Sequence, residues 1–225
     1  MDATTLSLQT VGAALAALSA LATAAFGLLD ASKAFWGGPS NIGQTHIKRA
    51  LAPFAPAMAA AVGEDRWWPM VRANWLNGMA KADQKAAAAN LVKLGLSPGT
   101  AEALALAGHV DPEALRGVAR ALVDGEPLTD QQLNVIGRLD AVLGLTLDAA
   151  YERAEQQYRN WARLLAGLVA MGLSLVAAWA LDPAKPSWMF AAVVGLLAVP
   201  MAPLAKDLTS ALSTAARALK AARAV

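Results

Sequence analysis

The sequence predicts an all-α integral membrane protein that has three transmembrane helices and a cytoplasmic helical domain. Of its 225 residues, 56% are hydrophobic and 16% are charged, whereas soluble domains average about 45–50% and about 25%. Three runs without a charged residue approach or exceed the ~20 residues that cross a bilayer. No stretch alternates apolar and polar residues as a half-buried strand does. These observations favour helices throughout and a membrane around some of them.

The three apolar runs define the predicted spans. The first covers residues 3–29, and we assign residues 1–30 to the first transmembrane helix. A cleaved signal peptide is the alternative, but the residues before this run carry no basic side chain. The other two runs cover residues 164–181 and 186–205, with only four residues between them. Two spans joined by so short a turn form a hairpin, which we place at residues 163–204.

Lysine and arginine residues near the predicted membrane ends indicate the orientation of the chain. Basic residues accumulate in cytoplasmic loops, and the side opposite to most of them has only Lys185, in the hairpin turn. We therefore expect the N-terminus outside and the C-terminus in the cytoplasm, in a bacterial inner membrane. The tail at residues 205–225 is expected to be a basic amphipathic helix on the inner leaflet. The cytoplasmic cations are Lys33, Lys48, Arg49, Arg153, Arg159, Arg163, Lys206, Arg217, Lys220 and Arg223.

Four of the seven tryptophans coincide with predicted membrane boundaries. Trp36 and Trp161 fall at the inner boundary, and Trp179 and Trp188 fall at the outer one. Tryptophan is enriched at the headgroup level, where its ring has both apolar and polar surroundings. These four residues are therefore the predicted interfacial anchors.

Residues 31–162 carry equal numbers of acidic and basic residues and show the signals of five or six helices. Helix starts are predicted at residues 97–98, 111–113 and 129–132, the last of these a capping box. Helix ends are predicted at Gly95, Gly108, Gly125 and Gly144. The expected core consists of Leu91, Leu94, Leu104, Leu106, Leu115, Val118, Leu122, Leu133, Ile136 and Leu143.

Trp67, Trp68, Val71 and Trp75 share one face of a predicted helix. We interpret them as large side chains that complete the core of the domain. One alternative is an interfacial helix that rests on the inner leaflet. The other is a stacking platform for nucleotides, which the absence of a surrounding basic groove disfavours.

One face of the first span is made of small or polar residues only. We call this face the seam, and its members are Thr5, Gln9, Gly12, Ala16, Ser19, Thr23 and Gly27. Small residues let helix backbones approach, and hydroxyl or amide groups can hydrogen-bond across the contact. The seam is expected to pack against the hairpin or a neighbouring copy, or else to line a water-filled pore. The opposite face, which includes Ala22, is expected to face lipid.

A second stripe, from Leu147 through Tyr151 and Ala154 to Gly172, recurs at helical spacing from the cytoplasmic segment into the second span. It predicts one helix of about 35 residues, onto which the helical domain docks. Contact between this helix and the same helix of a second copy is the alternative. The stretch from Tyr151 to Trp161, followed by a span that ends at Leu181, resembles a region of uncharacterised bacterial membrane proteins. Their layout is similar, with one N-terminal span, a cytoplasmic helical segment and a C-terminal hairpin. This resemblance implies no activity.

Most chemistry-bearing motifs are absent from the sequence. It contains no cysteine, two histidines, and no phosphate-binding loop, dinucleotide fingerprint, zinc motif or nucleophile elbow. We therefore expect no cofactor, no metal site and no enzyme, and the net charge of +2 gives no reason to expect nucleic acid. The expected function is a homo-oligomeric structural or interaction module that presents its cytoplasmic domain to a protein partner. The alternative is an oligomeric channel or pore that the seam lines.

Overall fold

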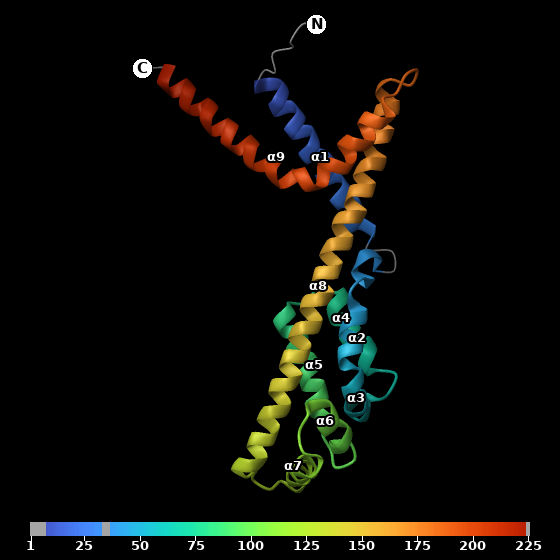
Figure 1. Ribbon diagram of the computed structural model, residues 1–225, viewed down its shortest axis with the longest axis vertical. Helices are drawn as coiled ribbons and strands as arrows, with labels where there is room; N and C mark the ends of the chain where they lie inside the picture. The colour runs from blue at the N-terminus through green and yellow to red at the C-terminus, as the bar shows by residue number, and fades with distance from the viewer. Residues whose placement is uncertain (1–7, 33–36, 224–225) are drawn as a thin grey trace. The chain divides into compact units, whose positions relative to one another are not determined.

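The computed structural model describes residues 8–32 and 37–223 (Figure 1). The described chain is all-α, with 84% of its residues in helices and no strand. The predicted all-α class is thereby confirmed. Two compact units are present. We call Met1–Pro39 with Arg159–Val225 the apolar unit, and Ser40–Tyr158 the helical domain.

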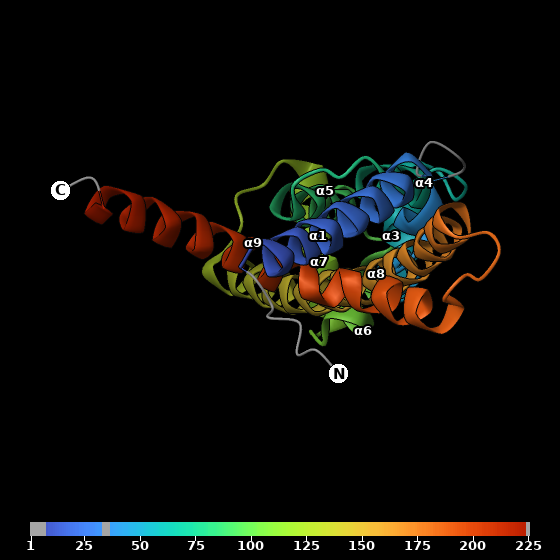
Figure 2. The ribbon, with the colours of Figure 1, turned by 90° about the horizontal axis from the view of Figure 1, so that it is seen from above.

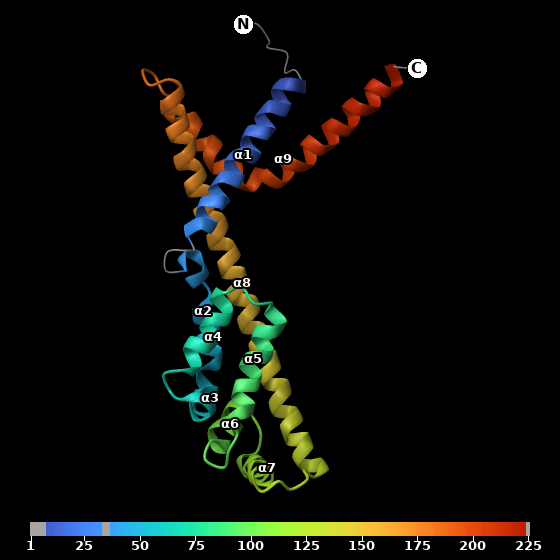
Figure 3. The same ribbon diagram turned by 180° about the vertical axis from the view of Figure 1, so that it is seen from behind.

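The apolar unit contains α1 (Leu8–Ala31), the second part of α8 (Asp130–Leu181) and α9 (Trp188–Arg223). A short turn joins α8 to α9, and in it the Lys185 backbone N–H donates to Asp182 Oδ1 at 3.2 Å. Pro200 and Pro203 lie inside α9. Figure 3 shows that the helix is bent between its two halves, as prolines inside a helix commonly cause.

Small residues form the buried centre of the apolar unit. At Gly195 the helices approach closely, because a Cβ added there would lie 2.4 Å from Met171 Cα. Helices in a bilayer associate by this kind of close packing, since lipid is as apolar as leucine. Figure 2 shows α1 beside the first half of α9. The buried cluster consists of Ala22, Ala25, Ala166, Ala170, Ala198 and Val199.

The prediction that Ala22 faces lipid was wrong. Its exposed fraction is 1%, because the face of α1 that includes Leu18 and Ala25 packs against the rest of the unit. The sequence pattern divides α1 into two faces. It could not show which of them the hairpin covers, because alanine is small enough for a packed face and apolar enough for a lipid face.

The helical domain contains six α-helices that precede α8, and the first part of α8 itself. The caps predicted at residues 111–113 and 129–132 are present, whereas the helix start predicted at residues 97–98 lies in a turn and α6 begins at Ala101. Asp111 Oδ2 accepts a hydrogen bond from the Ala114 N–H at 2.9 Å, and Thr129 and Gln132 bond reciprocally as a capping box. The helices are α2 (Gln44–Leu51), α3 (Ala55–Val62), α4 (Trp67–Leu76), α5 (Lys81–Leu94), α6 (Ala101–Gly108) and α7 (Pro112–Asp124), with the 3-10 turns η2 (Gly38–Asn41) and η3 (Ala52–Phe54) beside α2.

The predicted helix end at Gly144 was wrong, because α8 continues without a break from Asp130 to Leu181. A glycine inside a helix costs about 1 kcal/mol relative to alanine. Leu143 and Leu147, on either side of it, are buried in the core of the domain. Their burial outweighs the local preference, so the helix is 52 residues long instead of about 35.

Five of the ten predicted core residues are buried, and Ile136 packs partly buried against the core. Leu94, Leu106, Leu122 and Leu133 are instead at least half exposed. Short helices carry leucine on both faces here, so residue type alone did not identify the inner face. Other residues complete the core of the helical domain, among them Ile47, Phe54, Met58 and Tyr151.

The tryptophan-rich face of α4 belongs to this core. Trp67 and Val71 are buried, and the rings of Trp75 and Tyr151 lie 6.3 Å apart. Trp75 Nε1 donates to the Ser40 backbone carbonyl at 2.7 Å, which satisfies its polar group. The interpretation of this face as core is confirmed, because Trp68 and Trp75 are partly buried and pack against the same cluster as Trp67 and Val71.

Candidate functional site

The described helices of the apolar unit leave most of their apolar surface uncovered. Two of them, α1 over Val11–Ala31 and α8, are long and apolar enough to cross a membrane. In the most apolar 18-residue stretch of each helix, only 11% and 17% is buried. In α9, the apolar part is Trp188–Leu204, at the lower end of the ~17–25 residues of transmembrane helices. At the hairpin turn, Leu181 and Met189 are 87% and 84% exposed.

A groove of about 1400 Å³ lies among the three helices of the apolar unit. It is larger than the ~300–1,000 Å³ of most small-molecule pockets. Most of the lining is apolar, and the polar side chains in it are Ser19, Thr23, Asn160 and Arg163. The lining comprises Ala16, Ser19, Thr23 and Phe26 of α1, Asn160, Arg163, Leu164 and Gly167 of α8, and Leu196, Leu197, Val199, Pro200, Ala202 and Pro203 of α9.

Three residues of the seam line the α1 wall of this groove, together with Phe26. They are Ala16, Ser19 and Thr23, and Thr23 Oγ1 donates to the Ser19 backbone carbonyl at 2.8 Å. Gly12 is half-buried and Gly27 is exposed, and a Cβ added at either would meet no atom within 4 Å.

The other two seam residues are not described in the same detail. The backbone of Gln9 is part of α1, but its side chain is not described. Thr5 lies outside the described residues. Whether the seam is a contact between copies stays a prediction.

The predicted interfacial anchors are exposed where the structure describes them. The exposed fractions of Trp161, Trp179 and Trp188 are 46%, 57% and 50%. Trp36 lies outside the described residues. Half-exposed rings suit an environment that is apolar on one side and hydrated on the other. Their role as anchors stays a prediction.

Sequence reasoning missed the α8 and α9 walls of the groove. The sequence indicated Arg163 only as a cytoplasmic charge, and it assigned no site to Pro200 or Pro203. Gly167, on α8, is also in the wall. A basic residue at the predicted inner boundary, followed by a glycine one turn later, is the only signal in the sequence that could have pointed here.

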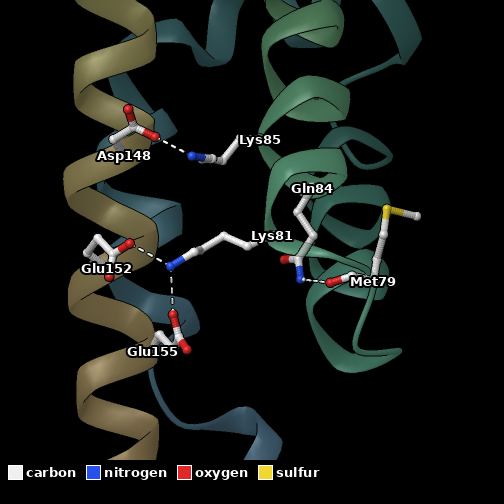
Figure 4. Close-up of polar contacts among 7 residues, drawn as sticks. All are labelled: Met79, Lys81, Gln84, Lys85, Asp148, Glu152 and Glu155. Atoms are coloured by element: carbon white, nitrogen blue, oxygen red, sulfur yellow. Dashed lines mark hydrogen bonds and ion pairs between the residues drawn. The ribbon is translucent and has the colours of Figure 1, made fainter.

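In the helical domain, a ladder of ion pairs joins α5 to α8 (Figure 4). Lys81 Nζ lies 2.5 Å from Glu152 Oε1 and 2.8 Å from Glu155 Oε2, and these hydrogen bonds raise the pKa of Lys81. Lys85 pairs with Asp148. Farther along, Lys93 Nζ lies 3.0 Å from Asp140 Oδ2. The pairs follow one antiparallel register, so they align α5 on α8, as the predicted docking of the domain onto this helix requires.

Tyr151 is fully buried, and its hydroxyl has no hydrogen-bond partner in the described part of the chain. Burial raises the pKa of Tyr151 to about 12, because the charged form loses its hydration. The folded state therefore favours the protonated form. Ionisation of Tyr151 therefore leaves the stability of the fold unchanged below pH 10, the ordinary pKa of tyrosine, and lowers it as the pH rises from 10 to 12.

Tyr151→Phe is expected to flatten this alkaline loss and to raise the unfolding temperature at neutral pH. An unpaired buried hydroxyl costs about 1–3 kcal/mol, and phenylalanine removes it while keeping the ring. Thermal unfolding of the full chain between pH 7 and 11.5 tests both effects. Tyr158→Phe is the control, because the Tyr158 side chain is only half-buried. An unchanged alkaline profile in Tyr151→Phe would contradict this account.

Among the described residues, no group of three or more histidine, aspartate and glutamate side chains is placed to hold a metal ion. Comparisons with protein-family models, curated proteins and solved structures found no match to this chain. The functional interpretation therefore depends on the geometry alone.

Proposed function

We propose that the chain is a multi-pass protein of the bacterial inner membrane, in which α1, the second part of α8 and the first part of α9 cross the bilayer. The contrast between the two units carries this proposal. The helical domain has a buried core with ion pairs on its surface. In the apolar unit, only a small share of the most apolar stretches of α1 and α8 is buried. Lipid is the solvent that makes such exposure favourable.

The proposed role is that of a structural or interaction module. The helical domain is presented on the cytoplasmic side to a protein partner, and the leucines expected in its core but exposed on its surface offer apolar contact area. Leu94 and Leu106, for example, are 69% and 68% exposed. The buried centre of a protein interface is more apolar than the rest of the surface, so such residues are candidates for it.

We also propose that copies of the chain associate through the seam, at Gly12 and Gly27. Both glycines lie outside the lining of the groove, and neither has a neighbour that an added Cβ would meet within 4 Å. A backbone of a second copy can therefore approach them closely, which is the geometry that favours helix association in lipid.

The test begins with membranes that contain the full chain. We expect the protein to stay in the bilayer after an alkaline wash and, in nanodiscs, to have the native mass of an oligomer. Gly12→Leu and Gly27→Leu should lower that mass, because a leucine separates the backbones. Ala17→Leu, at an exposed position on another face of α1, is the matched control. Release of the wild-type chain by the wash would contradict membrane insertion, and an unchanged mass in both glycine variants would contradict the seam contact.

A further inference from the structure

The groove of the apolar unit combines one cation with long apolar walls. In the α8 wall of the groove, the polar residues Asn160 and Arg163 come first along the chain, and Leu164 and Gly167 follow. The polar residues therefore lie at one end of this wall. Arg163 is exposed, and no acidic side chain of the described chain forms an ion pair with it. An arginine without an acidic partner can form charge-assisted hydrogen bonds with an anionic group such as a phosphate.

The α1 wall adds a second polar feature. The hydroxyl oxygen of Ser19 is buried and has no hydrogen-bond partner in the described residues, although Ser19 lines the groove. Because buried hydroxyls are normally paired, this group favours an occupant that offers a polar atom. Apart from Thr23, whose hydroxyl donates to the Ser19 carbonyl, and the polar residues of α8, the rest of the lining is apolar.

We propose that this groove binds one anionic phospholipid of the inner leaflet. The phosphate pairs with Arg163, the headgroup contacts the polar end of the α8 wall, and an acyl chain lies along the apolar walls. The proposal rests on the proposed membrane insertion, which places Arg163 at the level of the inner headgroups. A helix of a second copy fits less well, because residues 3–29, 164–181 and 186–205 bring no carboxylate to the cation.

The experiment uses the full chain in nanodiscs made of phosphatidylcholine with a small share of phosphatidylglycerol. Native mass spectrometry after release counts the lipids that stay bound. We expect wild-type protein to keep one phosphatidylglycerol in preference to phosphatidylcholine. Arg163→Gln should lower this preference about fivefold, the equivalent of the ~1 kcal/mol that one basic residue contributes near an anionic surface. Arg153→Gln, an exposed cation outside the groove lining, should leave it unchanged.

A second pair of variants tests the apolar walls. Gly167→Leu places a side chain in the groove, where an added Cβ meets no atom within 4 Å, and should abolish retention of either lipid. Gly172→Leu is the matched control, since its Cβ is equally unobstructed and it lies outside the lining.

The outcomes separate this inference from the proposed function. Equal retention of the two lipids by the wild type, an unchanged preference in Arg163→Gln, or full retention in Gly167→Leu would each overturn the lipid site while leaving membrane insertion intact. A fall in oligomer mass in Gly167→Leu, without a change in bound lipid, would assign the groove to a second copy and would also overturn the proposal. Failure of membrane insertion itself shows as release of the wild-type chain by the alkaline wash.

Discussion

Gly95→Ala is expected to lower the stability of the helical domain by about 3 kcal/mol, at the upper end of overpacking costs. Gly95 ends α5, and a Cβ added there would lie 1.8 Å from the backbone carbonyl oxygen of Ala57 in α3. The obstructing atom belongs to a helix backbone, so it cannot move aside as a flexible side chain would. Relief requires a shift of α3, which contributes Ala57 and Met58 to the core.

Gly137→Ala is the matched control for this substitution. Gly137 lies inside α8 with an exposed surface, and an added Cβ there meets no atom within 4 Å. Alanine is the better helix former by about 1 kcal/mol, so this variant should be slightly more stable. Thermal unfolding of the full chain, followed by circular dichroism, compares the two. Equal unfolding temperatures for Gly95→Ala and wild type would show that α3 and α5 are not in the contact described.

Gly195→Ala is expected to separate the hairpin helices of the apolar unit. The added Cβ would lie 2.4 Å from Met171 Cα and 2.7 Å from the Ala170 carbonyl oxygen, both in α8. Overpacking of this kind costs about 1–3 kcal/mol. It should also loosen the cluster of Ala166, Ala170 and Ala198. The expected result is a lower unfolding temperature in detergent micelles and faster proteolysis at the turn at residues 182–185.

The control for the hairpin is Gly172→Ala, one position beyond Met171 on the same helix. An added Cβ at Gly172 meets no atom within 4 Å, so the variant should match wild type or exceed it slightly. If Gly195→Ala and Gly172→Ala behaved alike, the close approach of α9 to α8 at Gly195 would be wrong.

The sequence was informative where local chemistry decides the structure. The cap at Asp111 and the capping box at Thr129 and Gln132 are contacts between residues three apart, so their spacing alone predicts them. The continuation of α8 through Gly144 depends on the burial of Leu143 and Leu147 against other helices. Nothing in the local sequence around Gly144 indicates that other helices stabilise this part of α8.

The candidate site was predictable only in part, for the same reason. The small and polar residues of the seam were recognisable from their periodicity, and three of them line the groove. The groove also needs Arg163 and Gly167 of α8 and the bent part of α9, which are far away in the sequence. Ala22 and Ala25 could not be assigned from the sequence, because alanine occurs both on faces that contact lipid and on faces that contact another helix.

The most direct test of the membrane proposal is the labelling of single cysteines with a membrane-impermeant maleimide. The chain contains no cysteine, so each variant reports one position. Ser187→Cys lies exposed beside the hairpin turn, and Glu126→Cys lies exposed in the loop before α8. In intact bacterial cells we expect Ser187→Cys to be labelled and Glu126→Cys to be protected until the inner membrane is permeabilised. Labelling of Glu126→Cys in intact cells, or protection of both positions, would contradict the proposed insertion and orientation.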